Sequence, residues 1–224
     1  MPFPHLYDKT MERSFEGSVN HITLRDMRTM EFFFDCSSPW TYLAFEQIQR
    51  SIEGKPIAIE WRPFLVGGVF NTVNPSVYAS RENPVPAKAK YYGKDLADWA
   101  RYVGVDIGSP PVFPVNSVKA MRGAFVAIER DVLIPYARRV FEAYWGELRD
   151  ISQDEVLADI VREVGVAPDE FFEKIGSDDY KTRLRENTQE LVDRGGFGSP
   201  TMFLDYEDMY FGNDRIPLIM AKLS

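Results

Sequence analysis

The spacing of apolar residues predicts a strand, a helix and a second strand near the start of the chain. Glu31–Cys36 carries three consecutive phenylalanines and has the β-propensity of a strand buried on both faces. A helix is expected over residues 40–52, because Ser38 and Pro39 form a strong helix start and apolar side chains then recur at helical spacing. Residues 56–64 alternate like a strand. This order predicts a βαβ unit with parallel strands.

The middle of the chain is expected to be helical, and its end returns to strands. Apolar residues recur at helical spacing, or capping signals occur, in six segments: 86–104, 116–130, 135–148, a start at Ser152 whose partner Glu155 completes a capping box, a segment after Pro168, and 178–194. Residues 200–204 and 209–211 predict a hairpin, and a last helix follows from residue 212.

This element order is that of an α/β thioredoxin-like fold with a helical domain inserted between its βαβ half and its ββα half. We expect a thioredoxin-like domain formed by residues 30–65 and 195–224, and a helical insertion domain over 66–194. Residues 1–29 show no sustained apolar period, so they are expected to form an N-terminal extension.

Charge and composition narrow the class of protein. The 224 residues include 34 acidic and 26 basic side chains, for a formal net charge of −8. This balance argues against binding to nucleic acid or to an anionic membrane surface. No segment approaches the roughly 18 apolar residues of a membrane span, and the N-terminus lacks the apolar run of a signal peptide. We therefore expect a soluble cytoplasmic protein.

One cysteine and two histidines limit the available chemistry. Cys36 alone cannot form an intramolecular disulfide or a Cys-rich zinc site. The two histidines, His5 and His21, both lie near the N-terminus, so no residue after position 21 can supply an imidazole group. This argues against a Ser-His-Asp hydrolase, an HExxH protease and a metal site. Cys36 ends a strand expected to be buried, where it would pack as a small apolar residue; a reactive thiol is the alternative.

The first candidate site is the helix start Ser38-Pro39-Trp40-Thr41. A helix N-terminus leaves N–H groups unsatisfied and carries positive potential, so it favours an anion. In a thioredoxin fold this place holds a Cys-x-x-Cys pair, whose first thiolate is stabilised by that potential. With Ser38 and Thr41 at the two positions, the site could still stabilise a thiolate brought by a ligand. The alternative is that Ser38 only caps the helix.

Two further candidates lie near the C-terminus. A cis bond between Ser199 and Pro200 would turn the N–H and C=O of Ser199 outward, ready to pair with an extended ligand; a plain loop is the alternative. Asn213 and Asp214 stand at a helix start, where they could act as caps or could hold a ligand ammonium group. The sequence favours neither role.

Together, SPWT after a buried strand, GSPT before the hairpin and FGNDR after it resemble one family. It is the DsbA-like thioredoxin group that contains 2-hydroxychromene-2-carboxylate isomerases and kappa-class glutathione transferases. The resemblance covers roughly residues 30–223 and includes WRPFLVGGVFN (61–71), NPVPAK (83–88), VFPVNS (112–117) and YWGELRDIS (144–152). The last two segments look more like the isomerase. The chain departs from the family in its N-terminal segment and in Trp40, where Phe or Tyr is more usual.

The resemblance implies glutathione as the cofactor, bound along the loop that contains Ser199 and Pro200. Ser38 would hydrogen-bond the glutathione sulfur and favour its thiolate, and Ser199 would pair its backbone with the cysteinyl part. Asn213 and Asp214 would hold the γ-glutamyl end.

Four more positions follow from the resemblance. Lys88 and Asn74 match family positions near the ligand, and Lys88 would suit a carboxylate of glutathione or of an aromatic acid. Trp40 and Asn116 would contact the substrate. We therefore expect a glutathione-dependent isomerase of aromatic-compound catabolism, in which the thiolate adds to a conjugated carbon, the former double bond rotates and the thiolate leaves.

Other functions stay open at this point. A kappa-like glutathione transferase or peroxidase would consume glutathione, and a dithiol oxidoreductase is disfavoured by Ser38 and Thr41. A non-catalytic thioredoxin-fold protein would show no turnover. The expected partner is a small aromatic molecule, neither nucleic acid nor membrane, and the resemblance suggests a homodimer.

Overall fold

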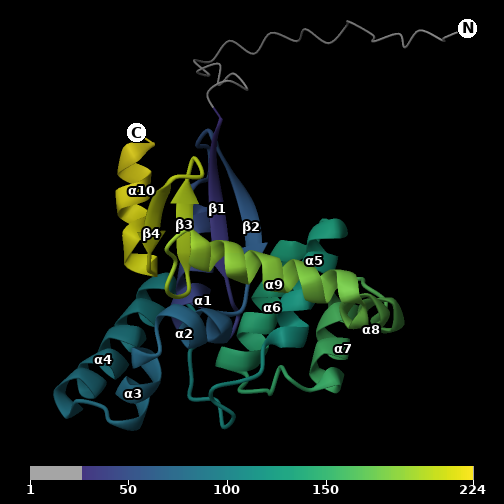
Figure 1. The fold of residues 1–224 in the computed structure, drawn as a ribbon, viewed down its shortest axis with the longest axis horizontal. Helices are drawn as coiled ribbons and strands as arrows, with labels where there is room; N and C mark the ends of the chain where they lie inside the picture. The colour runs from purple at the N-terminus through teal and green to yellow at the C-terminus, as the bar shows by residue number, and fades with distance from the viewer. Residues whose placement is uncertain (1–26, 224) are drawn as a thin grey trace, which may run out of the picture.

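The computed structural model describes residues 27–223, which form a four-stranded mixed sheet with helices on both faces (Figure 1). The strands are ordered β2-β1-β3-β4. Strand β1 runs parallel to β2 and antiparallel to β3, which pairs antiparallel with β4. The predicted parallel βαβ unit and C-terminal hairpin are confirmed. The strands are β1 (Arg28–Phe34), β2 (Ile57–Pro63), β3 (Thr201–Leu204) and β4 (Asp208–Phe211).

Helix α1 (Pro39–Ser51) connects β1 to β2, and a long helical segment connects β2 to β3. After β4 the chain forms the 3-10 turn η3 (Asn213–Arg215) and helix α10 (Ile216–Lys222). Within residues 27–223, no helix has the length and apolar character needed to cross a membrane. The helical segment contains α2 (Val66–Val73), α3 (Ser76–Glu82), α4 (Pro86–Val103), α5 (Val118–Glu129), α6 (Leu133–Phe141), the π-helical η2 (Glu142–Gly146), α7 (Asp154–Glu163), α8 (Pro168–Gly176) and α9 (Asp178–Asp193).

The structure differs from the sequence-based expectation at several elements. The expected helix over 135–148 is divided into α6 and the π-helical η2, and the expected last helix begins only at Ile216, after a 3-10 turn. Helices α2 and α3 are additional to the expected elements; both are short, both lack a side-chain cap, and α3 buries no residue, so neither carries a sequence signal. The expected capping box is wrong, because α7 follows Gln153 and has no side-chain cap. Strand β1 begins at Arg28, two residues before the expected domain boundary. Residues 1–26 of the expected extension lie outside the described residues.

The two faces of the sheet contact separate hydrophobic cores. Met30, Phe32 and Phe34 of β1 lie in the main core with residues of α1, α5 and α10. Phe33 points to the opposite face and packs with residues of α2, β3 and α9. Figure 1 shows α9 crossing this face of the sheet. Strand β1 is therefore buried on both faces, as its sequence predicts.

A buried ion cluster fixes the end of α9 on the sheet. Glu31 of β1 is 1% exposed and contacts Arg62 of β2 at 3.2 Å and Arg194 at 2.5 Å. The Arg194 guanidinium also lies 3.8 Å from the centre of the Phe203 ring. Because Arg194 is the C-cap of α9, this cluster sets where the following loop, residues 195–200, begins. That loop forms one wall of the cavity described next.

Candidate functional site

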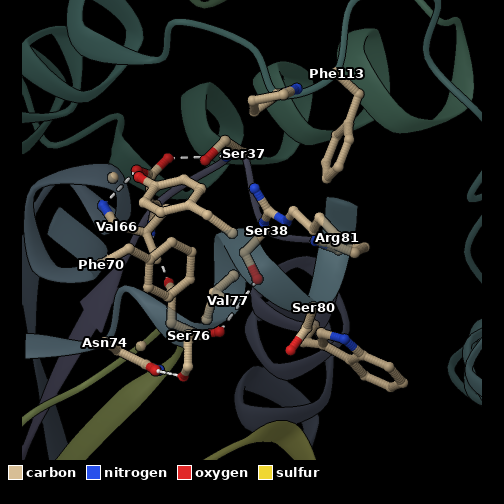
Figure 2. Close-up of a pocket in the computed structure, with 18 of the residues that line it drawn as sticks. Ser37, Ser38, Val66, Phe70, Asn74, Ser76, Val77, Ser80, Arg81 and Phe113 are labelled. Atoms are coloured by element: carbon tan, nitrogen blue, oxygen red, sulfur yellow. Dashed lines mark hydrogen bonds between the residues drawn. The ribbon is translucent and has the colours of Figure 1, made fainter. Parts of the chain in front are cut away.

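A cavity of about 990 Å³ lies where the N-terminus of α1, the α2–α4 segment, the start of α5 and the 195–200 loop meet (Figure 2). Its volume is at the upper end of the range for small-molecule sites, roughly 300–1,000 Å³. The structure brings together six of the nine site residues predicted from sequence, and these six line the cavity: Ser38, Trp40, Asn74, Lys88, Asn116 and Ser199.

Ser38 is the N-cap of α1, as predicted. Its Oγ accepts a hydrogen bond from the backbone N–H of Thr41 (3.3 Å) and donates one to the carbonyl oxygen of Ser199 (3.2 Å). Pro39 occupies the first turn of the helix. The hydroxyl therefore lies at the positive end of α1, facing the 195–200 loop.

The 195–200 loop is joined to α1 mainly through Ser199. The Ser199–Pro200 bond is cis, as hypothesised from the sequence. Ser199 Oγ lies 2.7 Å from Thr41 Oγ1 and accepts from the backbone N–H of Asp35 at 3.2 Å. The backbone N–H of Ser199 makes no hydrogen bond with any residue in the described range 27–223. An extended ligand in the cavity could pair with this group.

Asp35 is a fully buried carboxyl group in the cavity lining that sequence reasoning missed. One of its oxygens accepts from the backbone N–H of Ser37 (2.9 Å); the other accepts from the backbone N–H of Val66 (2.9 Å) and from Ser117 Oγ (3.1 Å). It thus ties the end of β1 to the starts of α2 and α5. Burial raises the pKa of Asp35, and these hydrogen bonds oppose that rise.

Cys36 is buried beside the site and away from its surface. Its backbone N–H donates to the Met121 sulfur (3.3 Å), and its carbonyl accepts from Trp145 Nε1 (3.0 Å). Burial and the nearby Asp35 raise the pKa of the Cys36 thiol well above its ordinary value. Cys36 lies in the main hydrophobic core, so the expectation that it packs as a small apolar residue is confirmed.

Two other predicted residues have local structural partners. The Asn74 side chain donates to the Phe197 carbonyl (3.1 Å) and accepts from Ser76 Oγ (2.7 Å), so it joins the α2–α3 connection to the 195–200 loop. Asn116 Oδ1 accepts from the backbone N–H of Val118 at the start of α5 (3.1 Å). Both residues therefore shape the cavity wall.

Aromatic and basic side chains give the cavity its chemical character. Trp40 Nε1 donates to the Tyr92 hydroxyl (2.9 Å), and their rings meet edge to face. Arg81 and Lys88 are its basic lining residues, and Asp35 is the acidic one. Neither Arg81 nor Lys88 forms an ion pair within residues 27–223. In a chain of net charge −8, this local excess of positive charge favours an anionic ligand.

Comparison with known proteins shows which family the chain belongs to. The profile of the DSBA-like thioredoxin domain matches residues 29–224. The chain belongs to this family. It is 29% identical to glutathione S-transferase kappa 1 of Caenorhabditis elegans over 207 residues, covering 87% of this chain and 90% of the relative.

Isomerases are among the relatives of this DSBA-like thioredoxin protein. It is 28% identical to a 2-hydroxychromene-2-carboxylate isomerase of Pseudomonas putida over 199 residues, covering 87% of this chain and 93% of the relative. A solved structure of such an isomerase matches with a TM-score of 0.72 and 25% identity, covering 87% of this chain and 93% of the other. The recognised family and the thioredoxin-like fold are confirmed.

The other three predicted residues, Pro200, Asn213 and Asp214, lie outside the cavity lining. Neither Asn213 nor Asp214 caps a helix, because Gly212 precedes η3 and no side-chain cap forms. Asp214 is exposed and pairs with Arg215 (3.0 Å), whereas Asn213 is only 3% exposed, and its Nδ2 lacks a partner within the described chain. Pro200 contributes its carbonyl oxygen to the Gly212 N–H (3.1 Å).

Proposed function

We propose that this protein is a glutathione-dependent isomerase of conjugated aromatic acids. The observation that carries the proposal is the Ser38 hydroxyl at the N-terminus of α1, in a large cavity whose lining contains no cysteine. A site that stabilises a thiolate without containing a thiol requires the sulfur to come from a ligand. Relatives named as isomerases and as kappa glutathione transferases support a glutathione-dependent enzyme.

The residues present fit glutathione. The unpaired backbone N–H of Ser199 is suited to the peptide backbone of such a ligand, and Lys88 is suited to one of its carboxylates. The Ser38 hydroxyl donates to the Ser199 carbonyl here, and it can redirect its single proton to a sulfur while still accepting from Thr41.

When bound, glutathione would supply a thiol that acts as a transient nucleophile. The chain would contribute the positive end of α1 and the Ser38 hydroxyl, which together favour the ionised sulfur. Trp40, Phe70, Tyr92 and Phe113 give the cavity an aromatic lining that suits a flat apolar group. The Trp40 side chain is held by its hydrogen bond to Tyr92, so its ring has a fixed place in the cavity lining.

A kappa-type glutathione transferase is the second candidate, because relatives of both kinds share similar identity with this chain. An isomerase regenerates glutathione, whereas a transferase consumes it. The VFPVNS and YWGELRDIS segments favour the isomerase, and we rank that function first.

The experiment combines binding and turnover. Glutathione binding is measured by calorimetry, and the enzyme is then mixed with glutathione and 2-hydroxychromene-2-carboxylate while the absorbance spectrum and the free thiol are followed. The proposal expects a spectral change with no loss of thiol. Thiol loss with 1-chloro-2,4-dinitrobenzene, and no reaction of the chromene, would favour the transferase. Failure of the wild-type protein to bind glutathione would refute both functions.

A further inference from the structure

Arg81 is a cavity residue to which neither the sequence motifs nor the relatives assign a role. It lies on α3, and its guanidinium carbon is 5.7 Å from the ring centre of Phe70 and 5.2 Å from that of Phe113. Figure 2 shows its side chain extending into the cavity on the side of Ser38. Stacking on aromatic faces holds a guanidinium in place while leaving its N–H groups free to donate.

The charge of Arg81 is not neutralised by the protein. It makes no hydrogen bond or ion pair with another residue of the described chain, and the acidic lining residue, Asp35, already accepts three hydrogen bonds at the buried end of β1. Its positive charge acts to lower the pKa of Tyr92, against the rise that burial causes. The guanidinium therefore presents donors and positive charge to the cavity.

Arg81 belongs to a different element from the residues expected to hold the sulfur and the cysteinyl part of glutathione. Those residues come from the start of α1 and from the 195–200 loop, and Lys88, which suits a glutathione carboxylate, comes from α4, whereas Arg81 comes from α3. A carboxylate attached to a flat apolar group matches this place, because a guanidinium binds a carboxylate through two parallel hydrogen bonds and the neighbouring rings accept a planar group.

We propose that Arg81 binds the carboxylate of the aromatic co-substrate, and that Phe70 and Phe113 flank the conjugated part of the molecule. Arg81 is then a specificity-determining residue, which selects acids over neutral analogues of the same shape. The inference rests on the proposed function, since it assigns the second ligand of the same cavity.

The test measures the binding of three ligands separately by calorimetry, without turnover. The probes are trans-cinnamate, its neutral amide, and glutathione. The variants are Arg81→Gln and a matched control, Arg101→Gln, because Arg101 is an exposed arginine of α4 that does not line the cavity. Circular dichroism checks that each variant is folded.

We expect the wild type to prefer cinnamate over its amide. Arg81→Gln should weaken cinnamate binding by about tenfold or more, the range for a lost charged hydrogen bond, and should abolish the preference. Glutathione affinity should stay within twofold, and Arg101→Gln should change neither ligand. The proposal is overturned if wild-type protein does not bind cinnamate, if Arg81→Gln binds it normally, or if that variant loses glutathione instead. The proposed function fails on a different result, the absence of glutathione binding by wild type.

Discussion

Replacing Ser38 with alanine separates its structural role from its proposed chemical one. The Oγ atom makes two hydrogen bonds, accepting from Thr41 and donating to the Ser199 carbonyl. Loss of an N-cap serine costs about 1 kcal/mol of stability. We therefore expect Ser38→Ala to lower the free energy of unfolding by roughly that amount in urea denaturation, whatever its role toward a ligand.

The proposed chemical role predicts a second effect of Ser38→Ala, a change in the pKa of the bound glutathione thiol. If the Ser38 hydroxyl donates to the glutathione sulfur, its loss should raise the pKa of the bound thiol by about one unit, which corresponds to about 1.4 kcal/mol. A thiol whose pKa is lowered on binding releases a proton. Glutathione affinity of the wild type should therefore rise with pH until free glutathione itself ionises, near a thiol pKa of about 8.5.

The assay records thiolate absorbance of bound glutathione against pH, together with calorimetric affinity at each pH. Ser38→Ala should flatten the rise in affinity, and Ser38→Thr should restore it because threonine keeps a hydroxyl and is also an N-cap residue. Ser80→Ala is the control, since Ser80 lines the same cavity and makes no hydrogen bond through its side chain within residues 27–223. An unchanged thiol pKa in Ser38→Ala, with stability lowered by the cap amount alone, would show that Ser38 is only a cap.

Three further predictions concern the frame around the site. Glu31→Ala should lower the free energy of unfolding in urea by about 1–3 kcal/mol, because Arg62 and Arg194 lose their buried carboxylate partner and keep only the more exposed Glu190 in common. Glu31→Gln should cost less, and equal stability of Glu31→Ala and wild type would contradict the role of the cluster. Burial raises the pKa of Asp35 in the folded state, so the folded protein favours the protonated carboxyl. This stabilisation is fully present below the unfolded-state pKa of about 3.9, and it is lost as the pH rises through the folded-state pKa. The stability of wild type relative to Asp35→Asn should therefore fall as pH rises above about 4 in urea titrations, and a pH-independent difference would refute this. Gly198→Ala would place a methyl group 2.6 Å from the Phe211 ring, so the 195–200 loop must shift. Calorimetry should then show weaker glutathione binding, and an unchanged affinity would contradict the proposed binding of glutathione along this loop.

The first strands and helix α1 could be predicted because the sequence features that indicate them are local. Three phenylalanines in a row require burial on both faces, and the structure distributes Phe32 and Phe33 to opposite cores. Ser38 before Pro39 predicts a cap, and the cap forms. These inferences needed only neighbouring residues, so the start of α1 and the strands on either side of it could be placed from sequence.

Two parts of the cavity wall, helix α3 with Arg81 and the carboxyl of Asp35, could not be predicted, because their positions depend on residues far apart in the sequence. Helix α3 buries no residue and lacks a cap, so the sequence gives little sign of it. The Asn74 side chain before it reaches the Phe197 carbonyl across 123 positions of sequence, a contact that only the folded chain shows. Arg81 is an ordinary surface arginine by sequence, and only the folded chain places it beside Phe70 and Phe113 in the cavity lining. Asp35 had a weak signal, a carboxyl at the end of a buried strand, but its partners at Val66 and Ser117 appear only in the folded chain.

The two sides of the cavity differ in how tightly they are packed, and this difference bears on how the site acquires substrate selectivity. The thiolate-binding end is built from β1, α1 and the 195–200 loop, which are held together by Ser199, Thr41 and the cluster around Glu31. The opposite wall, α3 and the start of α4, is exposed and packs little against the cores. Side chains there can change with little effect on folding, because surface substitutions usually alter stability by less than about 0.5 kcal/mol. Substrate choice is therefore expected to depend on residues such as Arg81, while stabilisation of the glutathione sulfur is expected to depend on β1, α1 and the 195–200 loop.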